Sequence, residues 1–307
     1  MQKQLAVTAL KIFLPSGFDF WRTVFSHGWC SLLPFRVNKN LETFSRLLRL
    51  KDGTLADCTI KASTSSLRVD ALSASPLTKD QGTEVRDLLS ACLRLEEDFS
   101  PFHTEARRYP QYRWIAKRGV GRLLRAPTVF EDLIKMMCTT NCSWSLTTNM
   151  VHNLVGELGE KHPDGFMSFP TPQAIAGVSE KFVRKAIRAG YRSPYLIECA
   201  ERVASGELDV ESWRTSVLST EDLYRLVQGV KGMGPYAAGN LLRLLGRYSH
   251  LALDSWVRSQ YAEVHYNGRK VSDRTIERAY RRYGRWQGLF FWLEMTRPWF
   301  DKKFPDW

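Results

Sequence analysis

The hydrophobic pattern of the chain changes at Pro101, and this change constrains the fold more than any other feature of the sequence. From Phe18 to about Asp80, apolar and polar residues alternate in short segments separated by turn residues. A period of two bounded by turns predicts antiparallel strands. Beyond Pro101 the apolar residues recur at helical spacing. We therefore expect an α+β protein, with an N-terminal antiparallel β-sheet domain followed by a mostly helical core.

The alternating segments place the predicted strands and helices along the chain. Strands are predicted at 1–14, 18–25, 29–37, 44–50, 54–63 and 65–73, and a helix across the sheet at Lys79–Arg94. Further helices are predicted at 101–106, 129–138, 145–158, 171–176, 180–187, 193–205, 212–216, 220–227, 235–245, 255–261, 273–283 and 286–296, with Ser179, Thr220 and Ser272 as N-caps. The predicted domains are residues 1–114 and residues 115–307.

The composition favours a polyanionic partner over a membrane. Lys and Arg outnumber Asp and Glu by 44 to 32, which gives a net charge of +12. An acidic protein partner or a solubility role is the alternative. We expect no membrane partner, because no run approaches about eighteen uninterrupted apolar residues. Residues 1–14 lack a signal-peptide cleavage site, and the six cysteines form no CxxC pair, so we expect a cytoplasmic protein, nucleoid-associated if bacterial.

A glycine-rich turn between two amphipathic helices is the most informative motif. An apolar-periodic segment ends near Val227, the turn GVKGMG follows, and Pro235 begins a second helix at the position that best tolerates proline. We predict a helix-hairpin-helix at about 220–246. Gly232 and Gly234 would let the backbone turn tightly and leave amides free to face a phosphate, with Lys231 beside it. The alternative is a helical hairpin whose glycines serve the turn alone.

Asp254 follows the second hairpin glycine by twenty residues, after the apolar segment HLAL and before SWVRSQY. The hairpin and this aspartate together resemble the helix-hairpin-helix superfamily of DNA glycosylases. The segments 119–145 and 187–200 are similar to parts of 8-oxoguanine glycosylases, and the resemblance covers roughly residues 115–296. It implies an enzyme that flips a base out of double-stranded DNA and hydrolyses the N-glycosidic bond, and we expect a monomer.

The resemblance implies roles for three residues near the hairpin. Asp254 matches the carboxylate that stabilises an oxocarbenium-like sugar, although an aspartate before SWVR is also a favourable N-cap. Bifunctional members carry a Schiff-base lysine two residues beyond the second hairpin glycine, and here that residue is Tyr236. A phenol cannot form a Schiff base, so we predict a monofunctional enzyme that leaves an abasic site. We expect Lys231 to meet phosphate.

The resemblance also bears on cofactors. Members with an iron–sulfur cluster bind it through four closely spaced C-terminal cysteines, and no cysteine follows Cys199, so we expect no cluster and no required cofactor. In the family the hairpin carbonyls often bind a structural monovalent cation. Here those carbonyls belong to Gln228, Val230 and Met233.

Base extrusion leaves a gap in the duplex that a side chain must fill. Tyr191, in AGYRSP, matches a wedging aromatic, Arg192 would contact the orphaned base, and Asn141 would help to occupy the gap. A core tyrosine and a turn asparagine are the alternatives. Candidates for the base pocket are Trp144, Tyr236, Asn240, Trp256 and Glu294, although each aromatic could be core and Glu294 a solvated helix charge.

The sequence leaves the excised base open. The missing lysine and the chain length favour the alkylation-repair branch over 8-oxoguanine, and a hypermodified, for example cytosine-derived, base is a third candidate. A catalytically silent relative that binds distorted DNA is the alternative to an enzyme, and a lyase using another amine is a further one.

Overall fold

The computed structural model describes residues 5–303 of the chain. These residues form two compact units, the first ending at Glu211 and the second beginning at Ser212. The division differs from the boundary predicted at 114/115, because the helices that follow the sheet are joined to it through buried side chains. The predicted fold class, an antiparallel sheet followed by a helical core, is confirmed.

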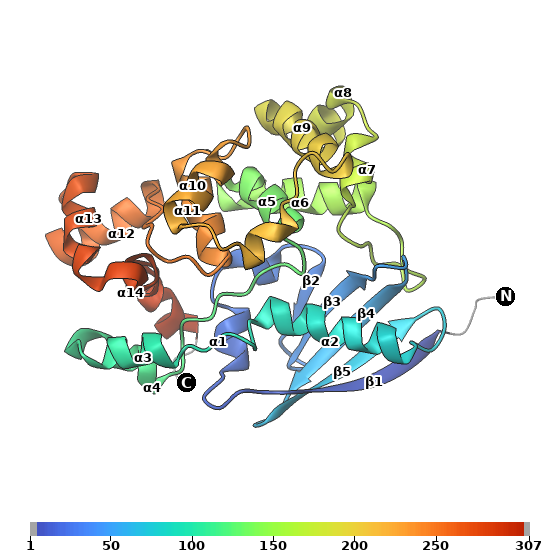
Figure 1. The fold of residues 1–307 in the computed structure, drawn as a ribbon, viewed down its shortest axis with the longest axis horizontal. Coiled ribbons are helices and arrows are strands. Elements are labelled where there is room, and N and C mark those ends of the chain that lie inside the picture. The colour runs from blue at the N-terminus through green and yellow to red at the C-terminus, as the bar shows by residue number, and fades with distance from the viewer. Residues whose placement is uncertain (1–4, 304–307) are drawn as a thin grey trace. The chain divides into compact units, whose positions relative to one another are not determined.

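The first unit is built on a five-stranded antiparallel sheet with strand order β1-β5-β4-β3-β2 (Figure 1). The strands are β1 (Ala6–Phe13), β2 (Phe35–Asn38), β3 (Thr43–Arg49), β4 (Leu55–Ala62) and β5 (Ser66–Ser73). Residues 1–4 of the first predicted strand lie outside the described residues. Leu10, Val69 and Ile60 pair across β1, β5 and β4, so they form an apolar row on one face.

Helix α2 (Lys79–Leu93) covers this apolar face (Figure 1). Thr78 and Gln81 form a capping box at its first turn. Gly82 faces the sheet, where a Cβ atom would lie 3.2 Å from Leu10 Cδ2. The helix predicted at Lys79–Arg94 is confirmed, and Arg94 ends it in a left-handed conformation.

The strand predicted at 18–25 is wrong, because this segment forms helix α1 (Phe20–Val24). Asp19 caps the helix by accepting a hydrogen bond from the Arg22 amide (2.8 Å). Phe20 and Val24 are both buried, and their spacing of four residues suits a helix. In the segment 29–37 only the last residues join a strand, since Gly28–Ser31 form a 3₁₀ turn before β2.

The helices of the first unit follow the sequence prediction, except for Arg113–Lys117, which was not predicted. They are α3 (Ser100–Arg107), α4 (Arg113–Lys117), α5 (Val129–Thr139), α6 (Trp144–Leu158), α7 (Pro172–Ala176), α8 (Glu180–Phe182) and α9 (Ser193–Ala204). The predicted N-cap Ser179 is confirmed, and a π-helical turn at Val183–Ile187 extends α8.

Helix α5 is joined to the sheet by a buried group of charges. Arg46 of β3 donates two hydrogen bonds to Glu131, one of them 2.7 Å long, and Lys135 Nζ lies 2.6 Å from the same carboxylate. All three side chains are at most 3% exposed. Trp29 Nε1 also donates to Asp132 Oδ1 (2.7 Å). Helix α5 therefore belongs to the same compact unit as the sheet, although it follows residue 114.

The second unit is helical throughout its regular structure. It contains α10 (Thr220–Gln228), α11 (Pro235–Leu244), α12 (Ser255–Tyr266), α13 (Asp273–Tyr280) and α14 (Gln287–Lys303). Ser272 caps α13 as predicted, whereas the N-cap of α10 is Ser219, one residue before the predicted Thr220. Within residues 5–303, the helices are too short or too polar to span a bilayer.

Candidate functional site: a hairpin and an aspartate loop

The predicted helix-hairpin-helix is present as α10, a six-residue turn and α11. Gly232 has φ +88°, which a residue with a side chain rarely adopts, so the turn itself requires glycine there. Gly234 is different, because its φ of −70° suits any residue and a Cβ atom would meet nothing within 4 Å. The backbone conformation therefore requires glycine at Gly232 and not at Gly234. Because Gly234 has no side chain, it leaves the surface at the start of α11 uncovered.

The start of α11 presents a phosphate-compatible surface. Gly234 is its N-cap and offers no side chain to cap the first amides, and Pro235 occupies the first helical position. Lys231 is exposed in the turn beside it. Helix N-termini with free amides favour anions, and the exposed lysine adds a positive charge.

Asp254 is the N-cap of α12. Its Oδ1 accepts a hydrogen bond from the Val257 amide (2.8 Å), and the residue is half-buried. Within the described part of the chain, Oδ2 of Asp254 accepts no hydrogen bond. The capping role and a chemical role suggested by the sequence are thus compatible, since one oxygen caps the helix and the other remains for a ligand.

Two glycines allow the loop before Asp254 to approach its neighbouring helices closely. A Cβ atom on Gly239 of α11 would lie 2.9 Å from Ala252 Cβ, and Ala252 itself has φ +55°. A Cβ atom on Gly288 of α14 would lie 2.1 Å from the carbonyl oxygen of His250. The amide of Gly288 instead donates to the Tyr248 carbonyl (2.7 Å). The loop therefore packs against α11 on one side and α14 on the other.

Arg243 of α11 is a buried cation that bonds to the same loop. Its side chain is 3% exposed, and Nη2 donates to the Leu251 carbonyl (2.7 Å) while Nη1 donates to Asn240 Oδ1 (2.7 Å). The guanidinium lies over the Trp292 ring, 5.1 Å from its centroid. Burial lowers the pKa of Arg243 to about 10, and the charge of Asp254 acts in the opposite direction. The sequence analysis missed this residue, because an arginine in an amphipathic helix looks like a solvated charge.

The pocket candidates of the second unit fall into two groups. Asn240 donates to the Tyr236 carbonyl (3.0 Å), and both residues are half-buried on α11. Trp256 is 44% exposed beside Asp254, and its ring centroid lies 6.3 Å from that of Trp292. Glu294 of α14 forms the other group.

Glu294 is engaged by side chains from two other helices. Tyr280 donates a 2.6 Å hydrogen bond to Oε2, and His265 Nε2 lies 3.1 Å from Oε1. These contacts join α14 to α12 and α13. Each carboxylate oxygen of Glu294 thus has one partner and a second lone pair, and its role in reading a base stays a prediction.

In the first unit, three predicted DNA contacts meet at Thr140. Asn141 adopts φ +46° after α5, and its amide donates to the Tyr191 hydroxyl (3.3 Å). Tyr191 is 47% exposed, so a wedging role remains open to it. Arg192 is buried, with its guanidinium against the Tyr191 ring and bonded to the Thr140 carbonyl. These contacts support the turn from within the unit, and the contact of Arg192 with an orphaned base stays a prediction.

Trp144 begins α6 and packs onto Gly28 and Trp29, neither of which was a predicted site residue. A Cβ atom on Gly28 would lie 2.3 Å from Trp144 Cη2, so glycine permits the indole to cover this backbone. Trp29 stacks on Trp144 at a centroid distance of 6.5 Å, and Trp144 remains 44% exposed. No alternation or spacing links residue 28 to residue 144, so only the fold could reveal this aromatic pair.

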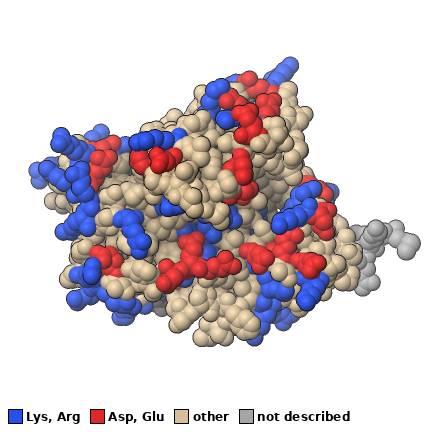
Figure 2. All heavy atoms as spheres, in the orientation of Figure 1, with Lys and Arg blue, Asp and Glu red and all other residues tan. Residues whose placement is uncertain are grey.

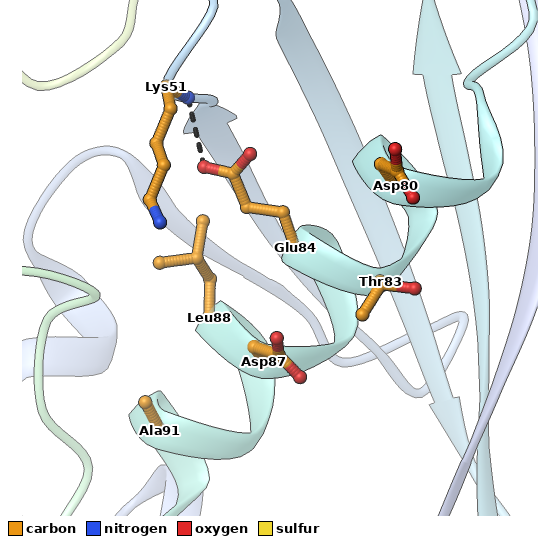
Figure 3. Close-up of a pocket in the computed structure, with 7 residues that line it drawn as sticks. All are labelled: Lys51, Asp80, Thr83, Glu84, Asp87, Leu88 and Ala91. Carbon is orange, nitrogen blue, oxygen red and sulfur yellow. Dashed lines mark hydrogen bonds between the residues drawn. The ribbon is translucent and has the colours of Figure 1, made fainter.

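Charge is unevenly distributed over the molecule. Figure 2 shows an acidic band along α2. A hollow of about 460 Å³ lies beside this helix, where Asp80, Glu84 and Asp87 face outward and Glu84 accepts a hydrogen bond from the Lys51 amide (2.9 Å) (Figure 3). This hollow would repel a polyanion, so we assign it no part in nucleic-acid binding.

Of the predicted ion ligands, Val230 and Met233 lie within the hairpin turn, and Gln228 is the last residue of α10. The carbonyl of Val230 accepts the Met233 amide (3.0 Å), which uses one of its two lone pairs. Oxygen donors of this kind suit a hard cation. Among residues 5–303, no three His, Cys, Asp or Glu side chains are grouped to hold a metal ion.

The fold and the hairpin define a two-part α+β protein with a helix-hairpin-helix motif. Residues 134–289 match the HhH-GPD superfamily of base excision DNA repair proteins. The match spans half of the chain, and the protein belongs to this family of DNA glycosylases. The resemblance drawn from the hairpin and Asp254 is confirmed.

Individual relatives are more distant. The chain is 27% identical to a probable N-glycosylase/DNA lyase of Methanothermobacter thermautotrophicus over 224 residues, which cover 65% of this chain and 70% of that protein. It shares its fold with the 3-methyladenine DNA-glycosylase of Archaeoglobus fulgidus (TM-score 0.74, 20% identity, 95% and 99% of the two chains). It also resembles an 8-oxoguanine glycosylase/lyase of Clostridium acetobutylicum bound to double-stranded DNA (TM-score 0.71, 19% identity, 97% and 100%).

Proposed function

We propose that the protein is a monofunctional DNA glycosylase, acting as a monomer on double-stranded DNA with Asp254 as its catalytic carboxylate. The observation that carries the proposal is the placement of Asp254. One oxygen caps α12 while the other accepts no hydrogen bond within the described residues, in a loop packed between α11 and α14. A charged group fixed before the reaction begins stabilises developing charge without reorganising.

The proposed reaction is hydrolysis of the bond between the base and C1′ of the sugar. The bonding electrons leave with the base, and the sugar acquires oxocarbenium character that the Asp254 carboxylate stabilises. Water then bonds to C1′, and the proton that it loses neutralises the departed base, leaving an abasic site. Tyr236, whose phenol cannot form a Schiff base with the sugar, occupies the position two residues after Gly234.

The absence of lyase activity departs from the name of the archaeal relative, a probable N-glycosylase/DNA lyase. The proposal rests on the chemistry of Tyr236. Borohydride added during the reaction would trap any Schiff base, so a trapped protein–DNA adduct would overturn the monofunctional assignment. We also propose that the carbonyls of Gln228, Val230 and Met233 hold a monovalent cation that stiffens the turn.

The experiment that tests the proposal is base release by Asp254→Asn. Asparagine is also a good N-cap, so the fold should survive while the charge is lost. We expect base release to fall by at least ~100-fold, with DNA binding and the melting temperature retained. The substrates are duplexes with alkylated purines, 8-oxoguanine or modified cytosines, and released bases are identified by mass spectrometry.

Two outcomes would contradict the proposal. An unchanged single-turnover rate in Asp254→Asn would remove this residue from the mechanism. Tight binding to every modified duplex without release of any base by the unaltered protein would make it a silent binder of distorted DNA. The duplex that loses its base fastest would identify the substrate.

A further inference from the structure

We propose that α13 and its flanking residues form a second phosphate-binding surface. It binds the part of the DNA duplex that leads away from Asp254. This surface, here called the basic ridge, consists of Arg269, Lys270, Arg274, Arg278, Arg281 and Arg285. All six residues are exposed. The inference rests on the proposed function, since it assigns a further part of the same DNA path.

The sequence places part of the ridge on one side of an amphipathic helix. Arg274 and Arg278 are four residues apart on α13, and Arg281 follows at its C-terminal end. Ile276 and Tyr280 are buried on the other side. Residues spaced by three or four positions lie above one another on a helix, so these three cations form a line.

Basic residues outnumber acidic residues along the ridge. Asp273 and Glu277 are the acidic residues in the segment 269–285. Asp273 is already bonded to Arg258 of α12 by two hydrogen bonds of 2.7 and 2.9 Å. Within the described residues, the side chains of Arg274 and Arg278 make no hydrogen bond or ion pair. The positive charge is therefore available to an external anion.

The ridge begins close to the proposed catalytic carboxylate. Asp254 caps α12, and the amide of Arg258, one turn later, donates to the Asp254 carbonyl (3.1 Å). The Arg258 side chain in turn bonds Asp273, the first residue of α13. One helical turn and one ion pair thus separate Asp254 from the start of α13. Figure 2 shows Lys and Arg gathered over the part of the molecule where Figure 1 places α13.

Arginine chemistry and charge density favour a nucleic-acid backbone as the occupant. A guanidinium binds phosphate through two parallel hydrogen bonds, and the line from Arg274 to Arg281 extends roughly 10 Å along the helix. Duplex DNA carries about one negative charge per 1.7 Å of its axis, so several phosphates fall within that length. We commit to the phosphates of the duplex that flanks the flipped base.

The test compares a ridge variant with a control of equal charge change. The ridge variant is Arg274→Gln with Arg278→Gln. The control is Lys79→Gln with Arg86→Gln on α2, whose outward side carries Asp80 and Glu84. Binding to a duplex of about 25 base pairs holding an abasic site is measured at salt concentrations from about 50 to 200 mM, together with melting temperature.

Each lost phosphate contact should lower the slope of log affinity against log salt by about 0.9. The ridge variant should therefore show a slope shallower by about 1.8, and the unaltered protein should lose about tenfold more affinity over this salt range. The control should match the unaltered protein.

The outcomes separate this inference from the proposed function. A shallower slope with no base release by the unaltered protein would support the ridge and overturn the glycosylase. Base release with identical slopes for the ridge variant and the control would support the glycosylase and overturn the ridge. Binding of an acidic polypeptide such as polyglutamate as tightly as DNA, with the same loss in the ridge variant, would also overturn the assignment to DNA phosphate.

Discussion

Buried cations occur in both units, and they are compensated in different ways. In the first unit, Arg46 and Lys135 share the carboxylate of Glu131, so the buried charges pair among themselves. In the second unit, Arg243 donates hydrogen bonds to the neutral oxygens of Asn240 and Leu251. In the first unit, buried cations bond to a buried carboxylate. In the second unit, a buried cation bonds to the backbone of the loop that carries the half-buried Asp254.

The difference indicates what each charge does. A buried ion pair adds little net stability compared with apolar residues, but removing one of its partners is strongly destabilising. Separating α5 from the sheet would break the Glu131 group, so this group holds the two elements together. Arg243 bonds to the segment just before Asp254 and stacks on Trp292. Its loss should disturb the position of the loop more than the stability of the unit. The predictions below test this contrast.

The largest effect should follow from Glu131→Gln. The substitution leaves Arg46 and Lys135 buried beside a neutral amide, and breaking a buried ion pair costs about 3–5 kcal/mol. We expect a large fall in the free energy of unfolding, measured by chemical denaturation. A triple variant with Leu at 131 and Met at 46 and 135 should recover most of that loss. A loss below about 1 kcal/mol in Glu131→Gln would show that the charges are not coupled.

The same group gives a pH dependence. Burial opposes ionisation of Glu131, but the charges of Arg46 and Lys135 outweigh it and the pKa of Glu131 lies below its ordinary value. A carboxyl group with a lowered folded pKa contributes stability at pH above about 4.3, and that stability is lost as pH falls through the folded value. Melting temperatures below pH 4 should therefore decline more steeply in the unaltered protein than in Glu131→Gln.

An intermediate effect should follow from Arg243→Met, which keeps the volume but removes the hydrogen bonds to the Asp254 loop. A shift of about 1 Å in a catalytic group costs on the order of 100-fold in rate. We expect base release to fall by about that factor, with little change in DNA affinity. Arg247→Met is the matched control, because the Arg247 guanidinium bonds the Ser216 carbonyl instead.

A double-variant cycle separates positioning from simple destabilisation. If Arg243 acts through Asp254, adding Arg243→Met to Asp254→Asn should reduce the rate little further, because the group that it positions has already lost its charge. Arg243→Lys should restore part of the rate in the presence of Asp254. Fully multiplicative losses, together with a lowered melting temperature, would make Arg243 a packing residue.

The elements that depend on local patterns in the sequence were predicted from it. The helices from α5 to α14, the hairpin and the N-cap position of Asp254 follow from apolar spacing, glycine, proline and capping residues. Contacts between segments that are distant in the sequence could not be predicted from local patterns. Nothing local links Arg46 to Glu131 or Gly28 to Trp144, and the strand predicted at 18–25 failed because burial of Phe20 and Val24 suits a helix there.

The smallest of these effects concerns Tyr191, and it tests whether the first unit contributes to DNA binding or only supports the fold. Its ring is 47% exposed, while its hydroxyl contacts the turn at Thr140 and Asn141. If the ring fills the gap left by an extruded base, Tyr191→Ala should lose about 2 kcal/mol of stacking, or roughly 30-fold in excision from duplex DNA. An already unpaired base needs little unstacking, so its excision should be almost unchanged.

Tyr191→Phe separates the ring from the hydroxyl. It keeps the stacking surface but removes the hydrogen bond from Asn141, so a wedge should tolerate it on duplex DNA. If the hydroxyl's support of the turn is what matters, Tyr191→Phe and Tyr191→Ala should lose activity alike, and on paired and unpaired substrates equally. That pattern would assign Tyr191 to the support of the Thr140 turn, with Arg192, and the first unit would then need another exposed side chain to fill the gap in the duplex.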